Sequence, residues 1–376
     1  MSAPIAFIDL QAQRQRLGEP LNRAILAAVE GGQWVMGPQV EELERKLAAF
    51  AGVKHCVACA NGTDALVVAL RAWDIGPGDA VFVPAFTFAA TAEVVALVGA
   101  SPVFVDVLPD TYNMDPASLA AAIAMVRQGG KLKPRVVVPV DLFGQPADYR
   151  TIAPIVAREG LKMLCDTAQG FGGALDGRRT GAIGDAATTS FFPAKPLGCY
   201  GDGGAIFTND DALAEVMRSI RIHGQGSHRY ENVRIGVNSR LDTIQAAVLL
   251  QKLTIFEDEI EKREAVAQRY NAALERSNRI VVPRVIPGAV SSWAQYTIQV
   301  PDRHRLQADL KALGIPTAVY YPIPLSKQKG YAHFPSAPIP ACERISDTVV
   351  SLPMHPYLDA ATQTKITDAV LKSVGG

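Results

Sequence analysis

Between residues 53 and 165, short apolar runs alternate with stretches of helical spacing, and this alternation restricts the possible folds more than any other feature. The runs are rich in valine and are bounded by Gly, Pro or Asp, which is typical of strands buried on both faces. The expected strands are His55–Ala60, Ala80–Pro84, Val103–Asp106, Arg135–Val140 and Lys162–Cys165, and the expected helices are Thr63–Trp73, Ala89–Val98, Pro116–Arg127 (capped by Asp115) and Tyr149–Arg158. Strands that alternate with helices predict a mainly parallel α/β sheet with right-handed crossovers.

The second half of the chain extends this sheet and then adds a smaller unit. Apolar runs at Ala187–Phe192 and Gly204–Thr208 are expected to join the sheet, and a charged helix over Leu241–Arg276 leads out of it. Beyond this helix we expect a strand at Gln295–Val300, a helix at Arg303–Leu313, a strand at Thr317–Tyr320 and two final helices. The predicted division is a large domain, residues 1–255, and a small C-terminal α/β domain, residues 256–376. The long loops 221–237 and 321–340 are candidate binding elements.

Charge and hydropathy exclude several classes of protein. The 376 residues carry 37 Lys and Arg against 37 Asp and Glu, which argues against a broad nucleic-acid or acidic-membrane surface. The longest apolar stretch, Ala89–Val107, is interrupted by Glu93, Pro102 and Asp106, so it is too polar to span a bilayer. No signal peptide is evident, and five cysteines indicate reduced thiols. We therefore expect a cytoplasmic protein.

Cys56 and Cys59 form a CxxC pair after His55, which is open to two interpretations. The pair could be half of a zinc site or a redox centre. No second CxxC or His pair completes a zinc set, and a redox pair usually opens a helix. We interpret both thiols as buried strand residues and expect no metal.

Asp166 ends the predicted strand Lys162–Cys165, where ligands of parallel sheets collect. A carboxylate at this position could hold a proton on a heteroaromatic nitrogen, as the electron-sink chemistry of a pyridoxal ring requires. Alternatively, Asp166 caps a following helix.

Lys195 follows Phe191, Phe192 and Pro193 and precedes the glycine-rich stretch 198–204. An apolar setting lowers the pKa of an amine, which favours Schiff-base chemistry. The alternative is a solvated surface lysine. The glycine run follows no clear strand and opens no helix, so it does not match a dinucleotide fingerprint, and no phosphate-binding Walker motif is present.

Three further positions suit a flat, phosphorylated ligand. Gly62 and Thr63 lie where a strand turns into a helix, a favourable place for phosphate, and Ser190 is a second phosphate candidate. Phe88 could stack on a ring. The alternatives are an ordinary Asn-Gly turn and a core phenylalanine.

Ordered motifs along nearly the whole chain resemble the DegT/StrS family of sugar aminotransferases. The motifs are Phe7–Leu10, Gly37-Pro38, Asn61–Leu66, Thr87–Thr91, Asp166–Gln169, Ser190–Lys195, Gly201–Gly204, Asn238–Asp242, Gln245–Ala247, Tyr321–Leu325 and Leu352–Pro356. The resemblance implies fold type I of the pyridoxal-phosphate enzymes, which is like that of aspartate aminotransferase. This fold has a large, mostly parallel sheet domain of seven-stranded type and a small C-terminal α/β domain.

The resemblance also implies roles for individual residues. Lys195 corresponds to the Schiff-base lysine and proton shuttle, and Asp166 to the partner of the pyridine nitrogen. Gln169 lies where the family places a group near the ring hydroxyl, and Phe88 corresponds to the stacking residue. The phosphate ligands correspond to Gly62, Thr63, Ser190 and, from the neighbouring subunit, Asn238. The active site would then be shared in a homodimer.

Within the family, residues 195–204 and 223–230 are most similar to enzymes that aminate C3 of UDP-2-acetamido-2-deoxy-3-oxo-glucuronate, with glutamate as donor and 2-oxoglutarate as product. Arg229 and Arg240 are candidates for binding the sugar carboxylate and diphosphate. Tyr320 and Tyr321 belong to the expected sugar-contact loop. Tyr320 and Ser326 stand where many relatives have His, which leaves the identity of the sugar open.

The resemblance implies a role in cell-surface polysaccharide biosynthesis, such as that of lipopolysaccharide O-antigen. Four alternatives remain at this point. They are amination of another UDP- or dTDP-linked 3- or 4-keto sugar, a non-catalytic regulator that binds the cofactor or sugar, a related dehydratase, and a binding protein without cofactor. The dehydratases replace the lysine with His, which this chain does not.

Overall fold

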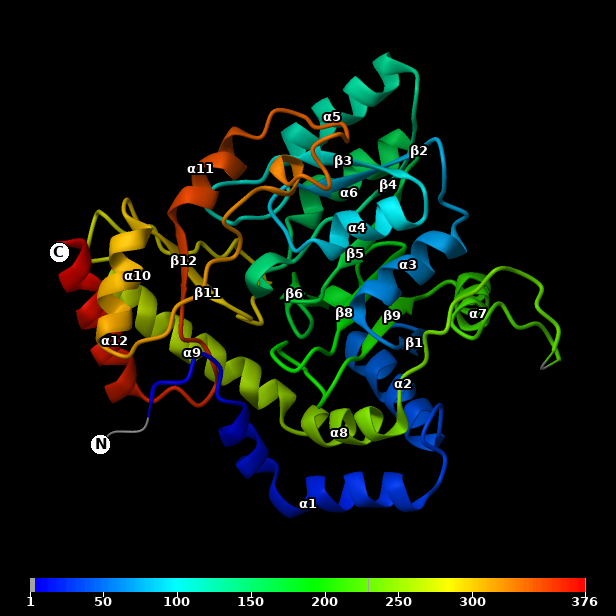
Figure 1. Ribbon diagram of the computed structural model, residues 1–376, viewed down its shortest axis with the longest axis horizontal. Coiled ribbons are helices and arrows are strands. Elements are labelled where there is room, and N and C mark those ends of the chain that lie inside the picture. Colours follow the sequence, from blue (N-terminus) through cyan, green and yellow to red (C-terminus); the bar gives the residue numbers. More distant parts are fainter. Residues whose placement is uncertain (1–3, 229, 376) are drawn as a thin grey trace.

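A seven-stranded sheet forms the centre of the computed structural model, which describes residues 4–228 and 230–375 (Figure 1). The strand order is β1-β9-β8-β5-β4-β2-β3. The bounds are β1 His55–Cys59, β2 Asp79–Pro84, β3 Ser101–Val105, β4 Lys133–Val137, β5 Lys162–Asp166, β8 Ala186–Ser190 and β9 Gly204–Thr208. The pairs from β8 through β5, β4 and β2 to β3 are parallel, and β9 is antiparallel to both of its neighbours. The predicted mainly parallel sheet is confirmed.

Helices cover both faces of this sheet. Alternate residues of a strand point to opposite faces, so the side chains of one strand enter two different cores. In β2, Ala80 and Phe82 belong to one buried core, and Val81 and Val83 belong to the other. The first core includes α2 Pro38–Ala51, α5 Pro116–Gly129, α6 Tyr149–Glu159 and α8 Thr243–Leu253. The second includes α3 Gly62–Ala72, α4 Ala90–Leu97, α7 Asp211–Ile220 and α11 Pro340–Thr348. A side chain such as Phe82, fully buried in this way, contributes about 1.5–3 kcal/mol of burial free energy.

Local capping follows the sequence at two helices near the sheet. The Asp115 carboxylate accepts a hydrogen bond from the Ala117 amide, and Pro116 begins α5, as predicted. In α3 the cap is Asn61, whose side chain accepts from the Asp64 amide, so the helix begins at Gly62 rather than at Thr63.

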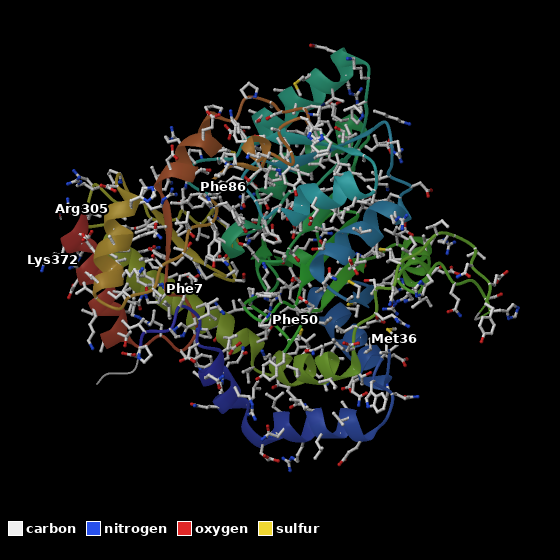
Figure 2. The ribbon with its side chains drawn as sticks, viewed as in Figure 1. Phe7, Met36, Phe50, Phe86, Arg305 and Lys372 are labelled. Atoms are coloured by element: carbon white, nitrogen blue, oxygen red, sulfur yellow. The ribbon has the colours of Figure 1, made fainter. Side chains whose placement is uncertain are left out.

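The predicted single helix over Leu241–Arg276 is wrong, because the structure has two helices there. Helix α8 ends at Leu253 and α9 runs over Phe256–Leu274. At the break, Phe256 enters an aromatic cluster, with its ring centroid 5.5 Å from that of Phe50 (labelled in Figure 2) and 6.0 Å from that of Phe171. Packing of Phe256 therefore directs α9 away from the sheet, toward the C-terminal elements seen in Figure 1.

The C-terminal elements surround a third buried core drawn from residues 266–374. Strand β11 Tyr296–Gln299 pairs antiparallel with β12 Val349–Leu352. Helix α12 Ala360–Val374 packs against α9, and α10 Arg303–Ala312 packs against α12. The predicted strand Thr317–Tyr320 is wrong, since only Ala318 forms a bridge, to Ser351. The partner of β11 is instead β12, whose short apolar run the pattern analysis missed. The domain boundary at residue 255 remains a prediction.

The remaining elements link these units. Helix α1 Leu10–Glu30 bends at Gly18, whose φ of 55° suits glycine, and packs Leu17 and Leu21 against Val248. The Phe7 carbonyl accepts from the Met354 amide, which ties the N-terminal segment to the third core. The short strands are β6 Ala174–Leu175, β7 Arg178–Arg179 and β10 Ala289–Val290, and the 3₁₀ helices are Leu142–Gly144, Thr180–Ala182 and Leu325–Lys327.

The cysteines and the helices bear on two earlier expectations. Cys56 and Cys59 are free, buried and part of β1, so the interpretation as strand residues is confirmed. The helices that the structure describes include none with the length and apolar character needed to cross a membrane.

Candidate active site

Strand ends from distant parts of the chain meet at one edge of the sheet. Strands β1 and β8 run in the same direction, because β9 is antiparallel to both, and β8 is parallel to β5. The carboxyl ends of parallel strands form the ligand-binding edge of such sheets. At this edge, the ends of β1, β5 and β8 border a cavity of about 640 Å³. Nine of the twelve predicted site residues line it, namely Gly62, Thr63, Phe88, Asp166, Gln169, Ser190, Lys195, Tyr320 and Tyr321.

Lys195 and Asp166 form the electrostatic centre of this cavity. Burial lowers the pKa of the Lys195 amine, and the nearby Asp166 carboxylate opposes that shift. Burial also raises the pKa of Asp166, whereas the Ala168 amide, the Thr91 hydroxyl and Lys195 act to lower it. An amine with a lowered pKa releases its proton more readily, which suits a nucleophile and proton carrier.

The Asp166 carboxylate is held by two hydrogen bonds. The Ala168 amide donates to Oδ1 over 3.1 Å, and the Thr91 hydroxyl donates to Oδ2 over 3.0 Å. Residues 167–172 form turns rather than a helix, so the alternative that Asp166 caps a helix is wrong. The two hydrogen bonds fix the direction of the carboxylate, because each oxygen has one partner.

The turn after β1 provides a close-fitting cradle beside Ser190. A Cβ atom built on Gly62 would lie 2.6 Å from the Ser190 Cβ, so glycine alone lets the start of α3 approach β8 this closely. The first amides of a helix have no intrahelical acceptors and favour an anion. The Thr63 and Ser190 hydroxyls border the same part of the cavity. This geometry fits a phosphate group.

Gln169, Tyr321 and Phe88 form another part of the wall. Gln169 Oε1 accepts from the Phe143 amide over 2.7 Å, and its Nε2 donates to the Tyr321 hydroxyl over 3.3 Å. The Phe88 side chain is 55% exposed, and its ring centroid lies 6.4 Å from that of Tyr321. Phe88 is therefore open to a flat ligand, and the alternative of a core phenylalanine is wrong.

Two predicted residues do not line the cavity, and a third is not among the residues that the structure describes. Asn238 is exposed and Arg240 is half-buried, and neither lines it. Arg229 lies outside the described residues. The roles predicted for these three residues therefore stay predictions.

The sequence analysis missed several residues that support the site. Thr91 and Thr87 belong to a recognised motif, but the sequence analysis gave neither residue a role in the site. Their hydroxyls lie 3.2 Å apart. Asp202 and Gln295 also line the cavity. Asp202 belongs to the motif Gly201–Gly204 and Gln295 begins a predicted strand, but the sequence analysis gave neither residue a role.

The loop that follows Lys195 is clamped by α8. Lys252 Nζ donates to the Gly198 carbonyl over 2.6 Å and lies 4.5 Å from the centroid of the Tyr200 ring. The Gln245 side chain accepts from the Tyr200 amide over 2.8 Å. Burial lowers the pKa of Lys252 to about 8. These contacts position the segment next to Lys195 from a helix that follows more than 40 residues later in the chain.

Asp141 is a buried carboxyl group next in sequence to Val140, which lines the cavity. Its Oδ1 accepts from the Tyr149 hydroxyl over 2.6 Å and from the Ala147 amide over 2.9 Å, while Oδ2 has no partner among the described residues. Burial raises its pKa to about 7. The ionisable groups near Asp141 include the Asp166 carboxyl group and the Cys165 thiol. Neither is a cation, so neither favours the charged form of Asp141.

Asp141→Asn should become more stable relative to the wild type as the pH rises from about 4 to 7. The folded protein keeps a proton to about pH 7 that the unfolded chain releases near its ordinary pKa of 3.8, so the wild type loses stability across this window. The difference should change by up to about 1.4 kcal/mol per pH unit and level off above pH 7. Urea unfolding at several pH values measures it. The same substitution at an exposed position, Asp74→Asn, is measured alongside as the control. A pH-independent difference for Asp141→Asn would contradict the prediction.

The geometry described so far defines a pyridoxal-phosphate enzyme of fold type I. A buried amine, a carboxylate with a fixed direction, a phosphate cradle and a stacking face all border one cavity. No group of three His, Cys, Asp or Glu side chains in the described part of the chain is placed to hold a metal ion.

Comparison with known proteins supports the same assignment. The model of the DegT/DnrJ/EryC1/StrS aminotransferase family matches residues 15–371. A protein of Pseudomonas aeruginosa named UDP-2-acetamido-2-deoxy-3-oxo-D-glucuronate aminotransferase is 49% identical, over 95% of this chain and 97% of its own. The crystal structure of a DegT DnrJ EryC1 StrS aminotransferase from Brucella abortus is 54% identical with a TM-score of 0.97, covering 99% of this chain and 100% of its own. NtdA from Bacillus subtilis, solved with bound cofactor PMP, is 28% identical with a TM-score of 0.88, covering 98% and 83%.

The chain belongs to the DegT/DnrJ/EryC1/StrS aminotransferase family. It is accordingly a sugar aminotransferase that depends on pyridoxal 5'-phosphate. The predictions of the family, the fold type and the cofactor are confirmed. The alternatives of a cofactor-free binding protein and of a non-catalytic regulator are not confirmed.

Proposed function

We propose that the protein transfers the amino group of glutamate to C3 of UDP-2-acetamido-2-deoxy-3-oxo-glucuronate. The Lys195 amine and the Asp166 carboxylate, which interact electrostatically and line one cavity, carry the aminotransferase part of this proposal. The 49% identity to the Pseudomonas aeruginosa enzyme over nearly the whole chain supports the substrate. A place in cell-surface polysaccharide synthesis, including lipopolysaccharide O-antigen, and a cytoplasmic location follow as parts of the same proposal.

The proposed roles of the residues follow from their positions. When bound, pyridoxal phosphate supplies an electron sink for the carbon that bears the amino group. Lys195 Nζ holds the cofactor between turnovers and then moves a proton at the reacting carbon, first as base and later as acid. Asp166 keeps a proton on the ring nitrogen, because its carboxylate is pinned by Thr91 and the Ala168 amide. Gly62, Thr63 and Ser190 would hold the phosphate, Gln169 would act near the ring hydroxyl, and Phe88 would cover the ring; all five residues line the cavity.

We also propose that the active enzyme is a homodimer with shared sites. Large apolar side chains outside the cavity are exposed, including Trp34 at 59%, Tyr230 at 89% and Ile235 at 79%. A second subunit that covered them would remove this apolar surface from water, which supports the proposal. The segment after α7 projects from the body in Figure 1, and the exposed Asn238 follows it. This exposure supports the proposal that Asn238 binds the phosphate of a neighbouring subunit.

The substrate carboxylate and diphosphate need cationic partners. Arg240 is half-buried, and its Nε has no hydrogen-bond partner in the described part of the chain. Guanidinium groups bind carboxylates and phosphates in a bidentate manner. We propose Arg240 and Arg229 for these contacts, with Tyr320 and Tyr321 lining the sugar part of the cavity.

Single-turnover spectroscopy tests the proposed reaction. Glutamate should convert the cofactor of the loaded enzyme to its amine form, and the 3-keto UDP-uronate should restore the original absorption spectrum. A dTDP-linked or 4-keto sugar that restores it faster would replace the proposed substrate. A protein that binds the cofactor but reacts with neither glutamate nor any keto sugar would be a regulator instead.

A further inference from the structure

A short turn carries Lys195 to the cavity, and hydrogen bonds within its own backbone close it. The Lys195 amide donates to the Phe192 carbonyl over 2.8 Å. The Cys199 amide donates to the Phe191 carbonyl over 2.7 Å, which joins the two ends of the turn. Residues 191–199 therefore form one closed unit, and the position of Lys195 depends on what holds this unit against the rest of the protein.

Helix α8 holds the turn through two side chains that lie seven residues apart. Seven residues make about two helical turns, so Gln245 and Lys252 project from the same face of α8. Lys252 Nζ donates to the Gly198 carbonyl over 2.6 Å, and the Gln245 side chain accepts from the Tyr200 amide over 2.8 Å. The end of the turn is thereby attached to the helical layer at two neighbouring positions.

Gly198 transmits this attachment to Lys195. A Cβ atom built on Gly198 would lie 2.5 Å from the Pro193 carbonyl oxygen and 2.6 Å from that of Phe192, so Gly198 packs directly on the backbone of both residues. Pro193 lies two positions before Lys195, and the Phe192 carbonyl accepts from its amide. A shift of Gly198 would consequently move the backbone from which the Lys195 amine reaches the cavity.

Lys252 is an unusual residue for a buried position. It is 1% exposed, and its Nζ contacts the Gly198 carbonyl and, at 4.5 Å, the centre of the Tyr200 ring rather than a carboxylate. The Glu259 carboxylate favours the charge only from beyond ion-pair distance. A buried ammonium group without a close ion partner costs free energy, so packing alone would favour an apolar side chain here. The hydrogen bond to the turn therefore explains the lysine better than a contribution to the core does.

We infer that Lys252 is a positioning residue, which through the Gly198 carbonyl holds Lys195 where its amine can transfer protons. Lys252 does not itself line the cavity. The inference rests on the proposed role of Lys195 in both half-reactions. A displaced turn should accordingly slow both half-reactions by the same factor, whereas loss of a substrate contact would slow only one. Misplacement of a reacting group by about 1 Å can cost about 10²-fold in rate.

Lys252→Met should lower the single-turnover rate constants with glutamate and with the keto sugar alike, by about 10- to 100-fold. Methionine has a similar length but neither the charge nor the donor. The KM for glutamate and the Kd of the aminated UDP-sugar should stay within about twofold of the wild type, because no binding contact is removed. Stopped-flow absorbance on the cofactor-loaded enzyme and isothermal titration calorimetry measure these quantities. Lys46→Met is the matched control, since Lys46 pairs with Glu42 on the surface.

Hydrogen–deuterium exchange of the cofactor-free protein gives a readout that does not depend on turnover. In Lys252→Met, peptides covering residues 191–200 should exchange about 10- to 100-fold faster, because a charge-assisted hydrogen bond no longer opposes local opening. Peptides from β5 and α12 should exchange as in the wild type. Lys252→Arg keeps the charge and the donors in another geometry and provides a second variant. In both variants, the rate of reaction and the exchange of residues 191–200 should change together.

Several results would overturn the inference. They are wild-type rates in Lys252→Met, slowing of one half-reaction alone, and a variant in which rate and exchange of the turn change independently. Faster exchange throughout the protein would show that Lys252 supports the whole fold rather than this turn. If Lys195→Ala itself still turned over, the proposed role of Lys195 would fail first. Normal rates in Lys252→Met beside an inactive Lys195→Ala would contradict the present inference alone.

Discussion

Lys195→Ala is expected to abolish amino transfer, with a loss of at least about 10⁴-fold in kcat. The substitution removes both the covalent link to the cofactor and the group that moves the proton, and general acid–base catalysis alone contributes about 10²–10⁴-fold. Stopped-flow measurement of the glutamate half-reaction checks the loss. Borohydride reduction followed by mass spectrometry checks the link, because the wild type should retain the cofactor covalently and the variant should not.

The control for this experiment is Lys327→Ala. Lys327 pairs with Glu343 on the surface and lies outside the cavity, so its removal should leave both rate and labelling unchanged. A Lys195→Ala protein that still turned over at more than a trace rate would show that another group is the base. Lys252 is the nearest alternative in chemical type, but its amine is held by the Gly198 carbonyl.

Asp166→Asn has the second-largest expected effect, a loss of roughly 10²- to 10³-fold in kcat with the cofactor still bound. An asparagine fills the same space but lacks the charge that holds a proton on the ring nitrogen, and removal of one preorganised electrostatic contact in a dry site typically costs this much. The KM for glutamate should change far less than kcat. Steady-state kinetics at saturating cofactor measure the two separately.

The same variant should change the titration of Lys195. The Asp166 carboxylate raises the pKa of the lysine amine against the effect of burial, so its removal should lower that pKa further. The rate of amine acylation in the cofactor-free protein, measured against pH, reports this shift. Thr91→Val is the graded control, since it removes one hydrogen bond to Asp166 and leaves the charge. Equal losses in both variants would show that direction, rather than charge, is what Asp166 contributes.

Much of the large sheet was predictable because its strands are short, apolar and separated by helical spacing. All seven predicted strands of the large sheet exist, with boundaries that differ by a few residues at most. The errors fell where packing overrides local pattern. Phe256 breaks a continuous helical pattern by entering the cluster with Phe50 and Phe171, and Val349–Leu352 forms a strand because β11 needs a partner.

The residues of the site also divide into those that local sequence features could select and those that depend on the fold. Lys195 and Asp166 could be selected from the sequence, because a carboxylate at a strand end and a lysine in an apolar, glycine-rich turn are local features. Their placement in one cavity, and the pKa shifts that each imposes on the other, required the fold. Resemblance to a family added the phosphate ligands and Gln169, whose position in the cavity is as expected.

The sequence by itself thus determined the order of the strands and helices along the chain and the strand ends at which ligands collect, and it led to the prediction of a Schiff-base role for Lys195. Only the tertiary structure decided that Thr91 holds Asp166 and that Lys252 clamps the loop after Lys195. The reason is physical. Helical and strand periods depend on neighbours a few residues apart, whereas these contacts join residues 54 or more positions apart through the packing of whole elements.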